Sequence, residues 1–455
     1  SAIYGEKGGF AFLWVALGSA VAGSAIILRK PKNMRFYLRE GFVTVALSWI
    51  LMSVIGCLPF VINGDIPHFA DALFEMISGF TTTGATVVSD VEGLTKGSLF
   101  WRSFSHWIGG MGVLVFLLAI VPMAGGSHMN LMKAESPGPS VGKLVPKVRQ
   151  TAKYLYIIYF TLTMIEVIFL LFGGMNLFEA LTTSFGTAGT GGFAIWNDGF
   201  VSVSPYNQWV VTIFMLLFGV NFGFYFLILT GKLRDALKFE EVRIYFIIVI
   251  AAAVFIFINL RHFALYAPAE GIRQAFFQVA SIITTTGFAS ADFNLWPETS
   301  RTILVLLMFI GACAGSTGGG IKVSRFIIAC KSFIKEIISY LHPRSVKKIK
   351  IEGKPLEHET LRATNVYFMT YMVIFAVSVL LVSIENKDLV TNFAAVAATF
   401  NNIGPGLSLV GPMENFGHFT DFTKYILMFD MLAGRLEIFP MMLLFCPAVW
   451  KRRRA

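Results

Sequence analysis

Charged side chains are scarce in this sequence. They make up 14% of its 455 residues, whereas a soluble globular domain carries about 25%. Hydrophobic residues make up 55%, and the mean hydropathy is +0.68. This balance leaves no room for a separate soluble domain and predicts a protein embedded in a membrane, because stretches able to cross a hydrocarbon core of ~30 Å recur along the chain. The expected spans are 10–28, 41–62, 100–123, 153–172, 206–230, 242–260, 301–340 (interrupted), 362–384 and 422–449.

Paired cysteines and clustered histidines are also missing. The four cysteines lie inside apolar segments without paired spacing, which argues against disulfides and against a cysteine metal site. The seven histidines are scattered, none lies four residues from another, and the sequence has no nucleophile motif. A membrane-embedded enzyme is therefore the remotest alternative, and no organic cofactor is expected.

Acidic residues are fewer than basic ones, 27 against 37, which gives a net charge of +10. The basic residues gather in alternate connections, at 29–39, 133–153, 232–243, 331–362 and 451–454. The connections between them are poor in Lys and Arg, and 173–206 has none. This is the positive-inside bias, which predicts basic loops in the cytoplasm and the intervening loops outside. It argues against a nucleic-acid partner and leaves the lipid bilayer, with its anionic headgroups, as one partner of the basic segments.

Four stretches of the chain follow one pattern, in which a short apolar run leads into small or polar residues and then a glycine. The stretches are Asp71–Thr83 before Gly84, Glu179–Gly191 before Gly192, Gln274–Thr286 before Gly287 and Thr391–Ile403 before Gly404. Each lies between two apolar spans, and the charge pattern predicts all four on the outer side. Four copies in one register predict a fourfold arrangement around a central axis.

Each run of about a dozen residues is too short to cross a membrane, so it is expected to form a helix that enters and turns back. The polar residue at each start, Asp71, Glu179, Gln274 or Thr391, suits a helix N-terminus. The C-terminal ends would then point their partial negative charge toward the axis. Backbone carbonyls beside the glycines would replace the water around a monovalent cation, so the pattern predicts an ion pore. Threonine hydroxyls at 81–83 and 284–286 would brace the loops or add oxygen ligands.

The expected fold is an all-α polytopic membrane protein with four tandem repeats of helix, pore helix, filter loop and helix around a central pore, as in potassium channels, plus an extra N-terminal transmembrane helix. The predicted parts are 1–40 (the extra helix and a basic connection), repeat 1 at 41–123, a cytoplasmic linker at 124–152, repeat 2 at 153–230, repeat 3 at 242–340, a basic linker at 341–361 and repeat 4 with its basic tail at 362–455.

An interruption inside repeat 3 is the second informative feature. Gly311–Gly320 holds five glycines together with Ser316 and Thr317 in the middle of an apolar run. Close helix packing would need only one or two of them, so a loop inside the membrane that acts as a gate below the filter is expected. Lys322 would either hold this loop closed or extend toward the interface. Arg435 lies inside a span at a cost of at least ~2.5–3.5 kcal/mol, so it should face pore water or a partner on another repeat.

These residues resemble the Trk/Ktr/HKT superfamily of potassium transporters, and most closely the bacterial TrkH-type membrane subunit. The resemblance covers 41–450 and is carried by the glycine tails and by HWIGGMG (106–112), GACAGSTGGGIKVSR (311–325), FNNIGPG (400–406) and GRLEIF (434–439). It implies one filter glycine per repeat, and glycine at all four positions is similar to the potassium-selective form. It also implies two helices before the first repeat, of which one is visible here.

The resemblance implies two sets of site residues. The potassium filter would contain Thr82, Thr83, Gly84, Gly191, Gly192, Thr285, Thr286, Gly287, Asn402, Ile403 and Gly404. The gate would contain Gly311, Gly315, Ser316, Thr317, Gly318, Gly319, Gly320, Lys322 and Arg435.

The expected function is potassium uptake across the bacterial inner membrane, with K⁺ as the transported ion. The resemblance implies a homodimer and a cytoplasmic nucleotide-binding regulatory subunit similar to TrkA or KtrA. The 331–361 loop is expected to contact that regulator. A cation symporter that couples K⁺ or Na⁺ to H⁺ or Na⁺ by alternating access remains the main alternative.

Overall fold

The protein is a helical membrane protein, seen in a computed structural model that describes residues 1, 4–6, 8–28, 38–112, 148–342 and 348–450. In these ranges five helices are long and apolar enough to cross a membrane, and a sixth span results if one sharply bent pair counts as one. The N-terminal helix α1 (Gly9–Ile27) is one of the five. The predicted membrane-embedded, helical character is therefore confirmed.

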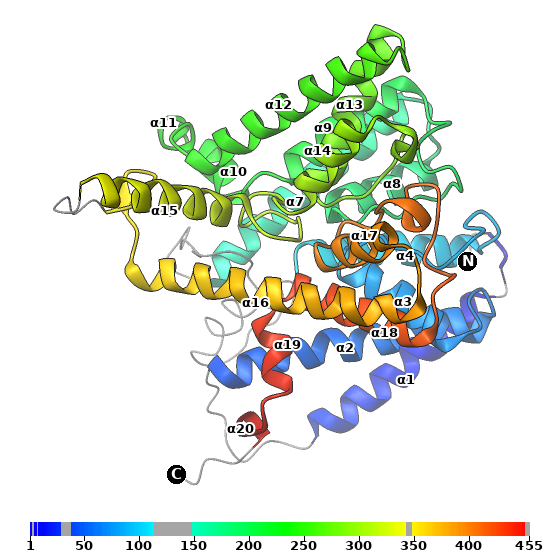
Figure 1. The fold of residues 1–455 in the computed structure, drawn as a ribbon. Coiled ribbons are helices and arrows are strands. Elements are labelled where there is room, and N and C mark those ends of the chain that lie inside the picture. The colour runs from blue at the N-terminus through cyan, green and yellow to red at the C-terminus, as the bar shows by residue number, and fades with distance from the viewer. Residues whose placement is uncertain (2–3, 7, 29–37, 113–147, 343–347, 451–455) are drawn as a thin grey trace.

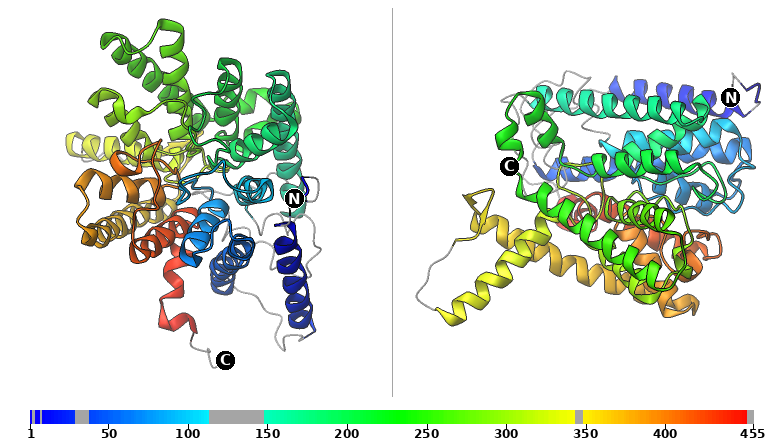
Figure 2. Two further views of the ribbon diagram at one scale, coloured as in Figure 1. Left: turned by 90° about the vertical axis from the view of Figure 1, so that its right-hand side faces the viewer. Right: turned by 90° about the horizontal axis from the view of Figure 1, so that it is seen from above.

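The helices are grouped around a common centre. In the left-hand view of Figure 2 the blue, teal, green and orange helices follow one another around the middle in chain order, while α1 lies at the edge. Figure 1 shows the short helices in one half of the molecule and α15 projecting from the other end. The centre is thus lined by segments far apart in sequence.

One order of elements recurs along the chain: a long helix, a short helix and a second, shorter or broken helix. The long helices are α2 (Leu38–Asn63), α7 (Val148–Phe172), α12 (Glu240–His262) and α16 (His358–Val382). The short helices are α3 (Phe69–Phe80), α8 (Leu177–Gly189), α13 (Pro268–Ile283) and α17 (Leu389–Phe400). The helices that follow are α4 (Lys96–Gly110), α9 (Pro205–Phe218), α14 (Glu298–Met308) and α18 (Asp421–Arg435).

Breaks in these following helices are more frequent than predicted. The interruption expected in 301–340 is present, because α14 ends at Met308 and α15 (Val323–Leu341) begins after it. The expected continuous span at 206–230 is wrong, since α9 and α10 (Phe222–Leu229) meet at 88°. The continuous span at 422–449 is also wrong: α18 stops at Arg435 and α19 (Phe439–Leu444) follows. Glu437 and Ile438 have φ of 61° and 68°, outside the helical region.

The starts of the short helices were predicted well in three cases. Asp71, Glu179 and Thr391 lie in the first turn of α3, α8 and α17, and Glu179 completes a capping box with Asn176. The prediction for Gln274 is wrong, because α13 begins at Pro268 and Gln274 lies inside the helix, where it is buried. Proline fits the first position of a helix because its missing N–H would have no partner there.

The remaining elements lie at the ends of the spans and in the connections. They are α11 (Leu233–Ala236), α20 (Pro447–Trp450) and the 3₁₀ turns η1 (Phe293–Leu295), η2 (Ser383–Glu385) and η3 (Ser408–Val410). Strands β1 (Lys350–Ile351) and β2 (Lys354–Pro355) form a small antiparallel hairpin in the linker before α16, which corrects the all-α prediction. Glu352 and Gly353 both have positive φ, as a two-residue hairpin turn of type I′ requires.

Several predicted parts lie outside the described residues. These are most of the 124–152 linker, the end of the expected 100–123 span, the basic stretch at 29–37 and the basic residues at 451–454.

Candidate functional site

The four short helices end in the same turn. Each turn is closed by two backbone hydrogen bonds. The residue two positions before the glycine donates its N–H to the carbonyl three residues earlier in the chain. The residue directly before the glycine donates its N–H to the carbonyl five residues earlier. In the first copy these are Thr82 N to Gly79 O (3.2 Å) and Thr83 N to Ser78 O (2.9 Å), and the other copies repeat both bonds at 2.8–3.1 Å. This is the Schellman turn, which satisfies the last carbonyls of a helix and reverses the chain. We call residues 81–84, 189–192, 284–287 and 401–404 the glycine loops.

Threonine occupies the left-handed position of three of the four turns, and asparagine occupies that of the fourth. Glycine is the common choice there, but this chain has Thr82, Thr190, Thr285 and Asn402, with φ of 54–57°. A β-branched residue at positive φ is strained, and strain of roughly 1–3 kcal/mol per residue persists only where the surroundings hold it. Two residues further on, the loop glycines also have positive φ, from 76° to 96°. The recurrence shows that the backbone path of these loops is held against its local preference.

The glycine loops form a closed ring. A Cβ added to Gly84 would overlap the carbonyl oxygen of Gly191, and one on Gly404 would lie 2.7 Å from that of Thr83. In the same way Gly192 faces the carbonyl of Thr286, and Gly287 faces that of Ile403. The glycine of each loop thus lies against a carbonyl of the following loop, from the residue directly before that loop's glycine. The glycine of loop four lies against loop one in the same way, which closes the ring. Only glycine leaves room for these carbonyls.

Side-chain hydroxyls and amides brace the ring. In loops one and three the first and third threonine hydroxyls bond to each other, Thr81 to Thr83 at 2.8 Å and Thr284 to Thr286 at 2.7 Å. The predicted bracing role of these threonines is therefore present. In loop four, Asn402 instead donates to the Thr83 hydroxyl at 3.0 Å. That bond joins the last repeat to the first.

A buried ion pair supports loop one and was not predicted from the sequence. The Glu75 carboxylate lies 2.7 Å from Arg102 and accepts from the backbone N–H of Val87, just past Gly84. Both side chains are at most 2% exposed. Arg102 also reaches the Ala194 carbonyl of repeat 2 at 3.4 Å. Removing one partner of such a pair leaves an uncompensated buried charge, which costs roughly 3–5 kcal/mol.

His106 joins the same two repeats, and only its place in the HWIGGMG motif pointed to it. Its Nδ1 lies 2.7 Å from the Gly79 carbonyl, and its Nε2 accepts from the Phe193 N–H at 3.2 Å. The two contacts define a neutral ring with the proton on Nδ1, because a carbonyl can only accept and an N–H can only donate. The ring is fully buried and holds helix α3 beside the second glycine loop.

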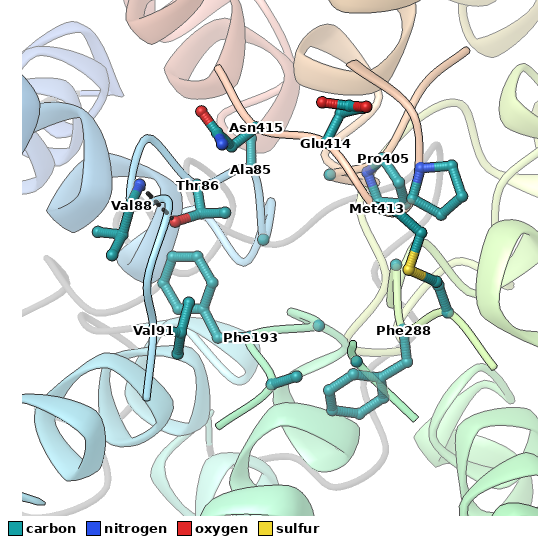
Figure 3. A pocket seen from close by; sticks show the side chains of 18 of the residues that line it. Ala85, Thr86, Val88, Val91, Phe193, Phe288, Pro405, Met413, Glu414 and Asn415 are labelled. Atoms are coloured by element: carbon teal, nitrogen blue, oxygen red, sulfur yellow. Dashed lines mark hydrogen bonds between the residues drawn. The ribbon is translucent and has the colours of Figure 1, made fainter. Parts of the chain in front are cut away.

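A cavity of about 120 Å³ opens on one side of the ring, lined by all four loop glycines. Figure 3 shows Phe193 and Phe288 on its walls together with Met413, Glu414 and Asn415 from the connection after η3. The Glu414 carboxylate places a negative charge at this face. Beside the apolar side chains, the lining includes backbone and the polar side chains of Thr86, Ser89 and Asn197.

The interrupted segment 309–322 lies against the helix-end side of the loops. The N–H of Gly319 donates to the Thr285 hydroxyl at 2.7 Å. Cβ atoms added to Gly319 and Gly320 would lie 3.1 Å and 3.2 Å from the Asn401 carbonyl. The segment also fills the break between α9 and α10, where Cys313 N–H donates to the Gly219 carbonyl at 3.1 Å. It therefore contacts glycine loops three and four and the second helix of repeat 2.

Two cations hold this segment. Lys322 is buried and donates to the carbonyls of Gly318 and Gly319. It therefore contacts the loop and does not extend to the interface, and a role in holding the loop closed stays a prediction. Arg435 donates to the Thr317 carbonyl at 2.8 Å and to those of Gly109 and Gly110 at 2.5 and 2.8 Å. Arg435 thus ties the segment to the end of α4, as the expectation of a partner on another repeat required.

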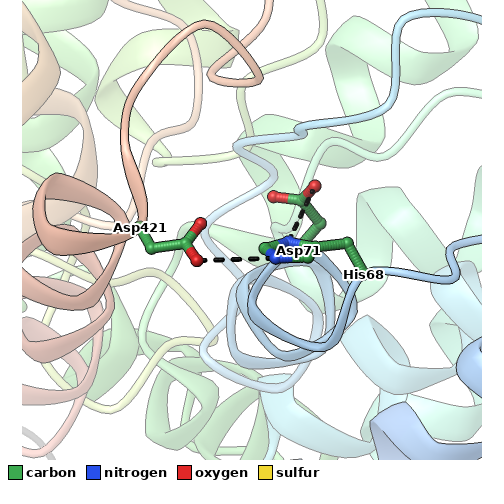
Figure 4. Close-up of side chains that lie close together, drawn as sticks. All are labelled: His68, Asp71 and Asp421. Atoms are coloured by element: carbon green, nitrogen blue, oxygen red, sulfur yellow. Dashed lines mark ion pairs between the residues drawn. The ribbon is translucent and has the colours of Figure 1, made fainter.

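A polar cluster joins the first and last repeats at the start of α3 and α18 (Figure 4). His68 lies between two carboxylates, with Nδ1 3.4 Å from Asp71 and Nε2 3.5 Å from Asp421. Lys424 approaches Asp71 to 2.6 Å and is nearly buried. Because Lys424 already pairs with Asp71, the cluster is an inter-repeat ion-pair network.

The structure thus brings the predicted site residues into two neighbouring groups. The eleven filter residues all lie in the glycine loops, and eight of the nine gate residues lie in or next to the segment below them, with Arg435 across from it. Gly311 and Gly315 are at the base of the segment, where they pack against the Ile321 carbonyl and Asn221. Their roles in conduction stay predictions.

Comparisons with known proteins find a matching family, similar sequences and a similar solved structure. Residues 10–452 match the model of the family described as TrkH, cation transport protein. The chain is 37% identical to the Trk system potassium uptake protein TrkH of Escherichia coli over 99% of its own length and 94% of that protein. It is 38% identical to the TrkH protein of Vibrio parahaemolyticus over 91% of this chain and 86% of that one. The crystal structure of the potassium transporter TrkH from Vibrio parahaemolyticus superposes with a TM-score of 0.88, at 33% identity, covering 99% of this chain and 94% of that chain.

Proposed function

This chain belongs to the TrkH family of cation transport proteins, and from that membership we propose that it takes up potassium ions through the ring of glycine loops. The observation that carries the proposal is the ring itself. The carbonyls of Thr83, Gly191, Thr286 and Ile403 occur at the same position of four loops, and each lies against the loop glycine of the preceding repeat. A ring of backbone carbonyls can replace the hydration shell of a monovalent cation.

Electrostatics favours a cation at this ring. Four short helices end at it, and a helix C-terminus carries about −0.5 elementary charge. The Thr82 hydroxyl and the Asn402 amide oxygen are buried, and neither has a hydrogen-bond partner among the described residues. Both are oxygen ligands of the kind that hard cations accept. Glu414 adds negative charge at the cavity on the other side.

We propose that the segment 309–322 limits passage below the ring. It lies against loops three and four, and Arg435 and Lys322 hold five carbonyls between them. A positive charge below a cation filter opposes passage, and removal of the segment would open a path. The four repeats at 41–123, 153–230, 242–340 and 362–455 would then form one pore, with the glycine loops outside and the basic loops in the cytoplasm of the inner membrane.

We also propose that this chain acts as a homodimer with a nucleotide-binding regulatory subunit that contacts the basic 331–361 loop. The charge of that loop supports the proposal, because it contains Lys331, Lys335, Lys348, Lys350 and Lys354. Helix α15, which carries the first two, projects from one end of the molecule (Figure 1).

Flux into vesicles tests the function. For purified protein reconstituted in sealed vesicles, we expect K⁺ to enter down its gradient faster than Na⁺, because the ring has four carbonyl ligands and glycine at every position. Protein-free vesicles are the control. Equal K⁺ and Na⁺ rates would contradict selectivity. Accumulation of K⁺ beyond ~2.3 kcal/mol per 100 mV of membrane potential would require the symporter mechanism instead.

A further inference from the structure

Two adjacent glutamates at the start of α12 connect the interrupted segment to the cytoplasmic linker. We propose that Glu241 positions the segment 309–322, and that the β1–β2 hairpin of the linker acts on it through the neighbouring Glu240. The expected effect on transport rests on the proposed function, whereas the contacts of Glu240 and Glu241 are independent of it.

Glu241 joins the segment to the start of α15 through one atom. Its Oε1 accepts from the N–H of Ala314 at 2.7 Å and from the N–H of Ser324 at 2.9 Å. The side chain is 7% exposed, so water competes little for these donors. Next to this contact, the N–H of Val323 donates to the Ala312 carbonyl at 3.0 Å. The chain at Ala312 and Ala314 is therefore held beside the chain at Val323 and Ser324, where α15 begins.

The Ser324 bond also completes α15. This helix begins at Val323, and its N-cap residue Lys322 makes no side-chain capping bond. The first N–H groups of a helix need acceptors, and a carboxylate there is also favoured by the helix dipole. Glu241 supplies that acceptor from another helix. Loss of Glu241 would therefore release the start of α15 and the entry of the segment at once.

Glu240 faces the linker. It pairs with Lys331 of α15 at 2.5 Å and accepts from the N–H of Glu352, at the hairpin turn, at 3.4 Å. Lys331 in turn donates to the Lys350 carbonyl of β1 at 2.7 Å. Since Glu240 and Glu241 are consecutive in the first turn of α12, a displacement of the hairpin moves the turn that carries Glu241. A partner that pulls on the linker would thereby reach the segment without contacting it.

The identity of the substituted side chain makes a sharp test. Both bonds end on one oxygen of Glu241. Glu241→Gln keeps an oxygen acceptor on a side chain of the same length. Glu241→Ala removes the acceptor, and Glu241→Asp shortens the side chain by one methylene. In reconstituted protein we expect the Ala and Asp variants to exchange the Ala314 and Ser324 amide hydrogens roughly tenfold faster or more, and to pass more K⁺. The Gln variant keeps the acceptor but loses the charge, so it should lie closer to the wild type than to the Ala variant in both.

Exchange in α3 and α8 is the internal control for folding and should stay unchanged. Lys331→Met removes the Lys331 contacts with Glu240 and with the Lys350 carbonyl, but it leaves Glu241 and the bond between Glu352 and Glu240 intact. It should therefore change K⁺ flux in the same direction by a smaller factor. Unchanged exchange and flux in Glu241→Ala would overturn the proposal. So would a Gln variant that behaves like Ala, because charge and not acceptor geometry would then be decisive. If exchange follows the expectation while the wild type itself carries no K⁺, the proposed function fails and the positioning role stands.

Discussion

Gly287→Ala is expected to abolish most potassium uptake while leaving the protein folded. Gly287 has a φ of 88°, and a Cβ there would overlap the Ile403 carbonyl and lie 2.9 Å from the Pro405 ring. The left-handed backbone alone costs an alanine roughly 1–2 kcal/mol, and the overlap forces a ring carbonyl to move. We expect K⁺ flux to fall by at least about tenfold, since each 1.4 kcal/mol is a factor of ten.

Gly174→Ala is the matched control for this prediction. Gly174 has nearly the same φ, 87°, but a Cβ there meets nothing within 4 Å. Both variants therefore carry the same backbone strain, and only one disturbs the ring. Both purified proteins should unfold cooperatively on heating, with Gly287→Ala the less stable because of its added overlap. Vesicle flux should fall only in Gly287→Ala. Equal flux from both variants would mean that the position of the Ile403 carbonyl does not matter for transport.

Arg435→Met is expected to raise potassium flux. Arg435 makes three hydrogen bonds to carbonyls, two to the end of α4 and one to Thr317 of the segment. A hydrogen bond from a charged group contributes roughly 1.5–3 kcal/mol. Losing the Thr317 bond and the positive charge should shift the segment toward open arrangements by about tenfold or more.

The control for Arg435 keeps the charge and changes the shape. Lysine cannot reproduce the forked guanidinium that reaches three carbonyls, so Arg435→Lys should lie between the wild type and Arg435→Met. Flux measured in vesicles, with Na⁺ as the competing ion, tests the series. A fall in flux for Arg435→Met, with normal thermal stability, would contradict a gating role and make Arg435 a support of the conducting path.

The short helices and their glycines could be predicted because they are local. A run of apolar residues ending in Thr-Thr-Thr-Gly contains its own helix, its own turn and its own need for φ > 0. The interruption at 311–320 was also local, since five glycines in ten residues cannot continue a helix. Composition and charge were enough to predict the membrane and the helical fold.

The contacts that hold the site depend on residues far apart in sequence. Glu75 and Arg102 are 27 residues apart, and Asn402 and Thr83 are 319 apart. The breaks after Phe218 and Arg435 were missed because no glycine run marks them. Ile438, with φ of 68°, is held in a conformation that its β-branched side chain disfavours. Ile438 is fully buried in the core, and the local sequence does not show that packing.

Heavy-cation density at the ring tests the central claim most directly. The account predicts that a structure determined in RbCl shows an anomalous peak on the axis among the carbonyl oxygens of Thr83, Gly191, Thr286 and Ile403, and that excess K⁺ removes it. Crystals of Gly174→Ala grown in RbCl should keep the anomalous peak at the ring, while crystals of Gly287→Ala should show a weaker one. Rubidium bound elsewhere in the protein, with none at these four carbonyls, would contradict the account.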